Sequence, residues 1–255
     1  MDRYIKIDEK VEGIVKKVSL YMRNLNYDYI KTEIFKAYLY ARDAHEWQNR
    51  LSWEPYISHP VEAAEILLDL KPDIYTIQAC LLHDVIEDTP KTSEEIKKEF
   101  WEEVAFLCEW LAKLSKIRYK WEDRDVWSLR KMVVAMAEDL RVIFVKLSDR
   151  LHNMKTLKYH PKIEKREKIA LETLNIFSPI ADRLWLYHIK NSLDEECFKI
   201  LDAESYRKLK RELKALEPQR KAFVKNVKEE IDILLKNNGL QNYEIDYRVK
   251  SIYSI

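Results

Sequence analysis

Apolar residues recur at three- and four-residue spacing through nearly all of the first 237 positions, with no window of strict alternation. The run containing Ile34, Tyr38 and Ala41 is one example, and the run of Val133, Met136 and Leu140 is another. This period matches one face of an α-helix, whereas a half-buried strand alternates every second residue. The pattern predicts an all-α fold, built as a multi-helix bundle.

Prolines and polar clusters divide this pattern into segments of roughly ten to twenty residues, an ordinary helix length. Thr92 followed by Glu95 has the form of a capping box that opens a short helix. Breaks between helices are expected at six places: Trp53-Glu54-Pro55, His59-Pro60, Lys71-Pro72, Thr89-Pro90, His160-Pro161 and Glu217-Pro218.

The character of the chain changes near its end. Residues 204–237 are highly charged and thinly apolar, which predicts one or two exposed helices leading out of the bundle. Asn237-Asn238-Gly239 is a helix stop, and residues 243–249 then alternate like a half-buried strand. A lone strand is not stable. We therefore predict one domain over residues 1–203, and over 204–255 linker helices with the first strand of a truncated second domain.

Composition limits the classes of function. Forty-five Lys and Arg balance 44 Asp and Glu, so the net charge of +1 lacks the basic excess of a bulk nucleic-acid binder. No apolar stretch is long enough to span a membrane, and the first residues lack the apolar core of a signal peptide. Three separated cysteines suit reduced core thiols. We expect a cytoplasmic protein that contacts neither membrane nor bulk nucleic acid.

Ionisable residues interrupt two apolar runs, which is unusual for helix faces that pack into a core. The run from Ile74 to Leu82 leads directly into His83-Asp84-Val85-Ile86-Glu87-Asp88. On one continuous helix, His83 and Glu87 would share a face, and Asp84 and Asp88 the adjoining face. The second run begins at Leu140 and reaches Asp149, Asn153 and Thr156, which follow one another at i, i+4 and i+7.

Two imidazoles and two carboxylates, from His59, His83, Asp84 and Asp149, form a donor set that suits Mn²⁺, Fe²⁺ or Zn²⁺. Such an ion makes hydroxide available and neutralises phosphate charge. Glu87 and Asp88 are placed to orient or deprotonate the water.

Other charged residues near these runs allow two interpretations. Arg50, Lys146 and Arg150 are either ordinary solvated charges or ligands for substrate phosphates. His45, His160 and His188 are expected at the surface or its boundary. His152 lies near Asp149 in sequence and is a candidate for a residue that orients the metal ligands without binding the metal itself.

Several segments, in order, strongly resemble the HD hydrolase domain of the RelA/SpoT family, which makes and degrades the guanosine alarmones ppGpp and pppGpp. These are YISHPVEAAEIL (56–67), TIQACLLHDVIEDT (76–89), LRKMVVAMAEDLRVIFVKLSDRLHNMKTL (129–157) and ETLNIFSPIADRLWLYHIKNSLDEECF (172–198). The resemblance covers roughly residues 30–210. Residues 248–255 resemble the opening of the family's synthetase domain, which the full-length protein would carry in cis; pyrophosphate transfer from ATP is not expected here.

The resemblance implies an all-helical HD fold, a Mn²⁺ cofactor and hydrolysis of the 3′-diphosphate of a guanosine nucleotide substrate, giving GDP or GTP and pyrophosphate. It assigns the metal to His59, His83, Asp84 and Asp149, and water activation to Glu87 and Asp88. It places Arg50 near the guanine ring and Asn153 and Thr156 against the nucleotide, and we add Arg150 as a substrate contact. Two alternatives are an HD phosphohydrolase of other nucleotides and a catalytically silent alarmone-binding regulatory module.

Two departures from the family pattern stand out. Leu51 replaces a basic residue. Five tryptophans occupy positions where related sequences carry glycine, while the whole chain has only two glycines and seven tryptophans. Our hypothesis is that UGA codons meaning glycine were translated as tryptophan; Trp121 and Trp127 are undecided. The five positions are Trp47, Trp53, Trp101, Trp110 and Trp185.

Overall fold

The computed structural model describes residues 3–115, 138–247 and 252–254, and every regular element in these ranges is helical. The all-α prediction is confirmed. Val133, Met136, Trp121 and Trp127 lie outside the described residues. Within the described residues, no helix is both long and apolar enough to cross a membrane. The helices are α1 (Ile5–Tyr21), α2 (Tyr27–Ala44), α3 (Ser58–Leu67), α4 (Ile74–Leu82), α5 (Val85–Asp88), α6 (Ser93–Glu99), α7 (Glu102–Ser115), α9 (Leu140–Thr156), α10 (Ile163–Glu172), α11 (Ser178–Arg183), α12 (Tyr187–Leu201) and α13 (Ala203–Asn237).

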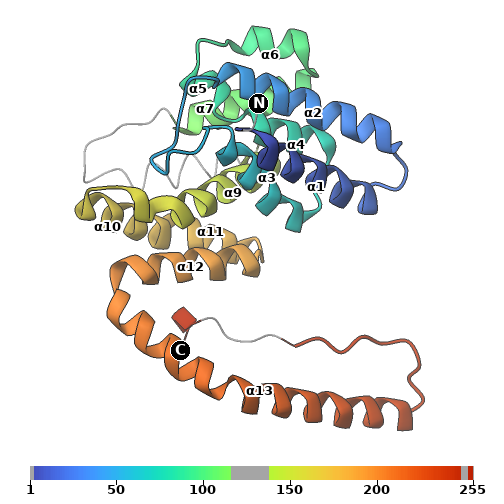
Figure 1. The fold of residues 1–255 in the computed structure, drawn as a ribbon. Helices are drawn as coiled ribbons and strands as arrows, with labels where there is room; N and C mark the ends of the chain where they lie inside the picture. Colours follow the sequence, from blue (N-terminus) through green and yellow to red (C-terminus); the bar gives the residue numbers. More distant parts are fainter. Residues whose placement is uncertain (1–2, 116–137, 248–251, 255) are drawn as a thin grey trace.

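The bundle is organised around α4, whose residues are buried along nearly its whole length. Helices α2, α3 and α7 pack against α4, and α3 also packs against α9 (Figure 1). Helices α10 to α12 form a second layer next to α9 and connect the bundle to α13. The contact between α3 and α9 matters most for function, because each of these helices carries candidate site residues.

Local signals explain several helix ends. Thr92 and Glu95 form the predicted capping box of α6. Two of the predicted breaks are wrong. Pro60 lies in the first turn of α3, where a backbone N–H has no partner within the helix. Pro218 lies inside α13, which curves but continues among exposed residues of high helix propensity (Figure 1).

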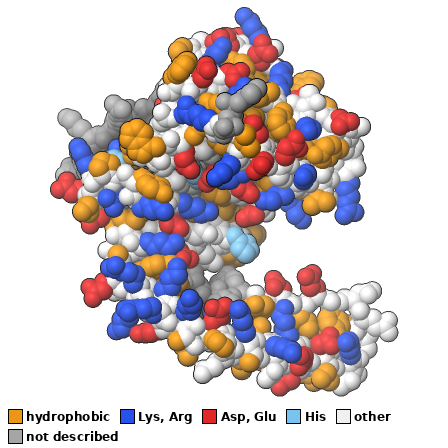
Figure 2. Space-filling view, viewed as in Figure 1, with side chains coloured by type: hydrophobic (Ala, Val, Ile, Leu, Met, Phe, Trp, Pro, Cys, Tyr) orange, Lys and Arg blue, Asp and Glu red, His pale blue; other side chains and the backbone are white. Residues whose placement is uncertain are grey.

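Helix α13 leads out of the bundle as the predicted exposed arm, with acidic and basic side chains mixed over its surface (Figure 2). The chain then returns along the helix, where the Tyr243 hydroxyl donates to Asp232. The strand expected over 243–249 is not formed in its described part, 243–247, because the described residues contain no other strand to pair with it. Residues 248 and 249 lie outside the described ranges. The domain boundary at residue 203 stays a prediction.

Two of the five tryptophans occupy backbone conformations that favour glycine. Trp185 has φ 58° after α11, where its N–H donates to the Asp182 carbonyl and that of Leu186 to the Ala181 carbonyl. This is a Schellman motif, whose left-handed residue is usually glycine. Trp53 has φ 69° and ends the three-residue loop that follows Arg50, another position that favours glycine.

Candidate active site

Three side chains from three helices converge in the interior of the bundle. His59 comes from the first turn of α3, His83 directly follows α4, and Asp149 lies on α9. All three are buried, and their nearest donor atoms lie within 4.8 Å of one another. The fourth predicted ligand, Asp84, places Oδ2 3.5 Å from Nε2 of His59 and 3.2 Å from Nε2 of His83. The fold therefore brings together all four residues of the predicted donor set.

The backbone around His83 differs from the sequence-based expectation of one continuous helix. Helix α4 ends at Leu82, His83 and Asp84 form a turn, and α5 begins at Val85. Nδ1 of His83 lies 2.7 Å from the Cys80 carbonyl oxygen, which fixes the ring against the end of α4. The turn lets two consecutive residues face the same cluster, which adjacent positions on one helix would not do.

The protonation pattern of His83 shows that this cluster suits a cation. A carbonyl oxygen can only accept, so Nδ1 of His83 must carry the proton that it shares with Cys80. Nε2 is then left without a hydrogen-bond partner, although it is buried. A buried unpaired nitrogen that faces two carboxylates is costly unless it binds a proton or a metal ion. The mixed nitrogen and oxygen donors fit Mn²⁺, Fe²⁺ or Zn²⁺.

The electrostatics of the cluster agree with this conclusion. Burial lowers the pKa of His59 to about 4, so this imidazole is neutral at neutral pH. Burial also acts to lower the pKa of His83, but the Asp84 and Asp149 carboxylates outweigh it and raise that pKa to about 10. The two carboxylates thus hold one extra proton on the imidazole of His83. A divalent cation would balance the same negative charge and release that proton.

Tyr56 is a site residue that the sequence analysis missed. Its hydroxyl lies 2.8 Å from Oδ2 of Asp84 and 2.8 Å from Oδ2 of Asp88, so it links the cluster to α5. His45 stacks on the Tyr56 ring with 4.5 Å between centroids and is only 2% exposed, so its predicted surface position is wrong. His160 is half-buried and His188 exposed, as predicted. Glu87 is exposed on α5 beside Asp88.

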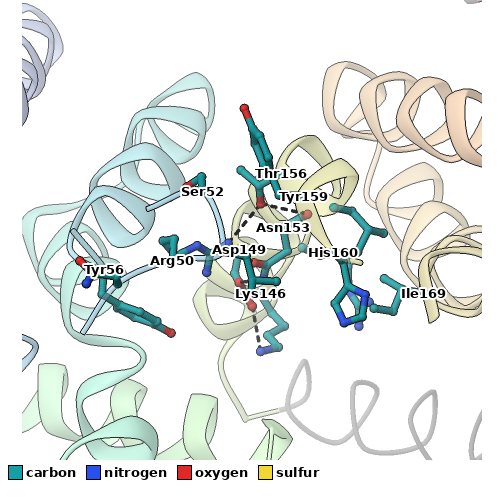
Figure 3. A pocket seen from close by; sticks show the side chains of 14 residues that line it. Arg50, Ser52, Tyr56, Lys146, Asp149, Asn153, Thr156, Tyr159, His160 and Ile169 are labelled. Carbon is teal, nitrogen blue, oxygen red and sulfur yellow. Dashed lines mark hydrogen bonds and ion pairs between the residues drawn. The ribbon is translucent and has the colours of Figure 1, made fainter. Parts of the chain in front are cut away.

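A cavity of about 430 Å³ adjoins the cluster at Asp149 (Figure 3). Lys146 lines it and holds the Asp149 carboxylate at 2.9 Å. Burial acts to lower the pKa of Lys146, but Asp149 outweighs it and the net pKa is raised, so the ammonium keeps its charge. Arg150 also lines the cavity, over the Phe177 ring and 3.4 Å from a Glu172 oxygen.

Another part of the cavity wall is built from the loop after α2 and the end of α9. Arg50 places Nη2 3.0 Å from Oδ1 of Asn153 and 3.1 Å from Oγ1 of Thr156 (Figure 3). Asn153 in turn donates to Asp149 at 2.5 Å. The predicted face of Asp149, Asn153 and Thr156 is confirmed, and Arg50 from a distant segment lies against it. The cavity thus joins an acidic cation site to a wall of cationic and amide groups.

Comparison with known proteins identifies what this arrangement is similar to. Residues 37–186 match the model of a family described as HD domain. The bifunctional (p)ppGpp synthase/hydrolase SpoT of Escherichia coli strain K12 is 45% identical over 222 residues, 86% of this chain and 31% of that protein. A guanosine-3′,5′-bis(diphosphate) 3′-pyrophosphohydrolase of Aquifex aeolicus is 46% identical over 228 residues, 88% of this chain and 32% of that protein.

A solved structure supports the fold. It is described as a metazoan ortholog of SpoT that hydrolyses ppGpp, and it covers 66% of this chain and 94% of its own, with a TM-score of 0.51 at 24% identity. The present chain spans about a third of the length of the curated relatives it matches.

Proposed function

Because this chain belongs to the HD domain family, we propose that it hydrolyses the 3′-diphosphate of ppGpp and pppGpp to GDP or GTP and pyrophosphate. The observation that carries the proposal is the buried cluster of His59, His83 and Asp149, which opens into a cavity with cationic walls. The names of the relatives from Escherichia coli and Aquifex aeolicus point to the same substrate.

His59, His83, Asp84 and Asp149 are proposed to hold a Mn²⁺ ion. When bound, such an ion lowers the pKa of a water molecule and neutralises charge on the phosphates. The unpaired Nε2 of His83 and the two carboxylates around it are the features that favour a divalent ion at this place. The mixed donor set agrees with Mn²⁺ and would also accept Fe²⁺ or Zn²⁺.

Asp88 and Glu87 are proposed to handle the proton of the attacking water. The water oxygen forms a bond to the phosphorus attached to the ribose 3′ oxygen, and the bond from that phosphorus to the 3′ oxygen breaks. Asp88 accepts the proton from the water, and that same proton ends on the released 3′ oxygen, so the step balances. Tyr56 donates to one of the Asp84 and Asp88 carboxylates at a time, so it keeps Asp88 next to the metal-binding residues.

The cavity offers separate contacts for the two parts of the substrate. Lys146 and Arg150 lie on α9 within one turn of Asp149, where they are proposed to bind phosphate oxygens. Arg50, Asn153 and Thr156 are proposed to contact the guanosine part. The family's synthetase domain in cis and a cytoplasmic location are further proposals; three free cysteines agree with a reducing compartment.

The regulatory alternative predicts a covered or incomplete site. No residue of α13 lines the cavity in the described part of the chain, and the four proposed ligands are present. These observations favour a working hydrolase over a silent module.

The test is pyrophosphate release from ppGpp by the purified chain with Mn²⁺ or with a chelator. Asp84→Ala should abolish turnover, whereas Asp69→Ala, which removes an exposed carboxylate directly after α3, should not. Activity on other nucleotides with none on ppGpp would support the broader HD phosphohydrolase instead. Nucleotide binding without turnover would support the silent module.

A further inference from the structure

A further buried histidine, His152, contacts His59 and does not line the cavity. Nδ1 of His152 lies 2.5 Å from Nδ1 of His59, and Nε2 of His152 lies 3.1 Å from Oε2 of Glu62. His152 is 3% exposed, whereas the Glu62 side chain is 37% exposed. A chain of contacts therefore runs from the cluster through two imidazoles to a carboxylate at the surface.

The positions of these residues follow from the packing of two helices. Glu62 lies three residues after His59 on α3, and His152 lies three residues after Asp149 on α9. Residues three apart occupy neighbouring positions on one side of a helix. Each helix thus supplies one residue to the cluster and, one turn later, one residue to the contacts behind it.

The hydrogen bonds fix which nitrogen of each ring carries the proton. Two ring nitrogens at hydrogen-bond distance need one donor and one acceptor. If Nδ1 of His152 were the donor in a neutral ring, its Nε2 would face the Glu62 oxygen as a second acceptor, which is repulsive. The hydrogen bond from His152 lowers the pKa of Glu62 to about 2, so this group is a carboxylate at neutral pH.

The remaining arrangement satisfies the contacts of His152 with both neighbours and leaves only Nε2 of His59 facing carboxylates, where a cation would satisfy it. Nε2 of His152 donates to Glu62, and Nδ1 of His152 accepts from Nδ1 of His59. The proton of His59 is then on Nδ1, and its Nε2 presents a lone pair toward Asp149, 3.2 Å away. That nitrogen is the one that the proposed metal site requires.

We propose that His152 and Glu62 are positioning residues that hold His59 in the tautomer and orientation needed to bind the metal ion. This inference rests on the proposed function, since it concerns the same cluster. Groups that orient a histidine ligand in this way typically contribute 10- to 100-fold to metal affinity. Lys10 pairs with Glu62 from outside and takes no part in the contacts between the rings.

Mn²⁺ affinity of the full chain, measured without nucleotide from the electron paramagnetic resonance signal of free Mn²⁺, tests the proposal. His152→Ala and Glu62→Ala should each weaken binding by about 10- to 100-fold. The double variant should bind no more weakly than His152→Ala, because Glu62 acts through His152. Lys10→Met, the matched control, should bind like the wild type.

Multiple-bond ¹H–¹⁵N NMR spectra of the metal-free chain provide a readout that a purely structural role would not change. His59 should be the Nδ1–H tautomer in the wild type and in Lys10→Met, and should lose this preference in His152→Ala. If His152→Ala does not fold, Glu62→Ala carries the test, because Glu62 lies partly at the surface.

Wild-type Mn²⁺ affinity in both alanine variants, or an Nε2–H tautomer of His59 in the wild type, would overturn the inference. A wild-type chain that binds no Mn²⁺ would overturn the metal-dependent function, and this inference with it. Tight Mn²⁺ binding that is weakened in the variants, in a chain without turnover, would support the inference and refute the proposed activity.

Discussion

Replacing Trp53 and Trp185 by glycine should stabilise the fold, although each change removes a large aromatic side chain. Their φ values of 69° and 58° lie in the left-handed region, where a side chain costs about 1–2 kcal/mol. The two residues are 87% and 77% exposed, so little buried apolar surface is lost. The greater conformational freedom of glycine in the unfolded chain reduces this gain in stability by about 0.4–1 kcal/mol per residue. The double variant should gain about 1–2 kcal/mol.

Urea unfolding followed by far-ultraviolet circular dichroism measures this gain without depending on tryptophan fluorescence. The corresponding rise in Tm is roughly 2–8 °C for a chain of this size. Trp110→Gly is the matched control, because Trp110 lies inside α7 and packs against the core. There glycine should lower stability by at least about 1 kcal/mol. Loss of stability in the double variant, as in Trp110→Gly, would refute the reasoning.

The gene tests the recoding hypothesis directly. UGA codons at the five tryptophan positions would support glycine as the intended residue. UGG codons would contradict the hypothesis and leave the stability prediction standing, because that prediction rests on backbone conformation alone.

Three further changes test the site. Tyr56→Phe removes the hydroxyl that links Asp84 and Asp88, and should lower kcat about tenfold with little change in KM, as steady-state kinetics would show. Arg50→Ala should instead raise KM about tenfold or more, with a smaller effect on kcat. A fall in kcat as large as the rise in KM would argue against a binding role. The pKa of Glu62 is depressed from 4.5 to about 2, so its stabilising effect is present above pH 4.5 and lost as pH falls toward 2. At this half-exposed site the carboxylate contributes about 1 kcal/mol or less to stability. The difference in Tm between the wild type and Glu62→Gln should therefore disappear as pH falls over that range.

Periodicity alone predicted the all-α fold and the shared face of Asp149, Asn153 and Thr156, because a helix repeats every 3.6 residues wherever it packs. The meeting of four ligands from separate helices depends on tertiary packing. Residue spacing within one helix cannot predict such a meeting, and the four ligands were assigned together from the resemblance to the RelA/SpoT family.

Other features had no local signal. The turn at His83 and Asp84 lies in a segment without glycine or proline, so no residue type marks it. The hydrogen bond between His83 and the Cys80 carbonyl is found at the same place. Tyr56 lies in an irregular loop, where no period indicates which way a side chain faces. The burial of His45 follows from its stacking on Tyr56, a contact that its own neighbours in sequence do not predict.

Hydrolysis of ppGpp in ¹⁸O-labelled water, with the products analysed by mass spectrometry, tests the central claim most directly. The account predicts Mn²⁺-dependent formation of GDP and pyrophosphate in equal amounts, with the label in pyrophosphate because water attacks phosphorus. Release of orthophosphate, label in the GDP, or undiminished turnover in the presence of a chelator would contradict it.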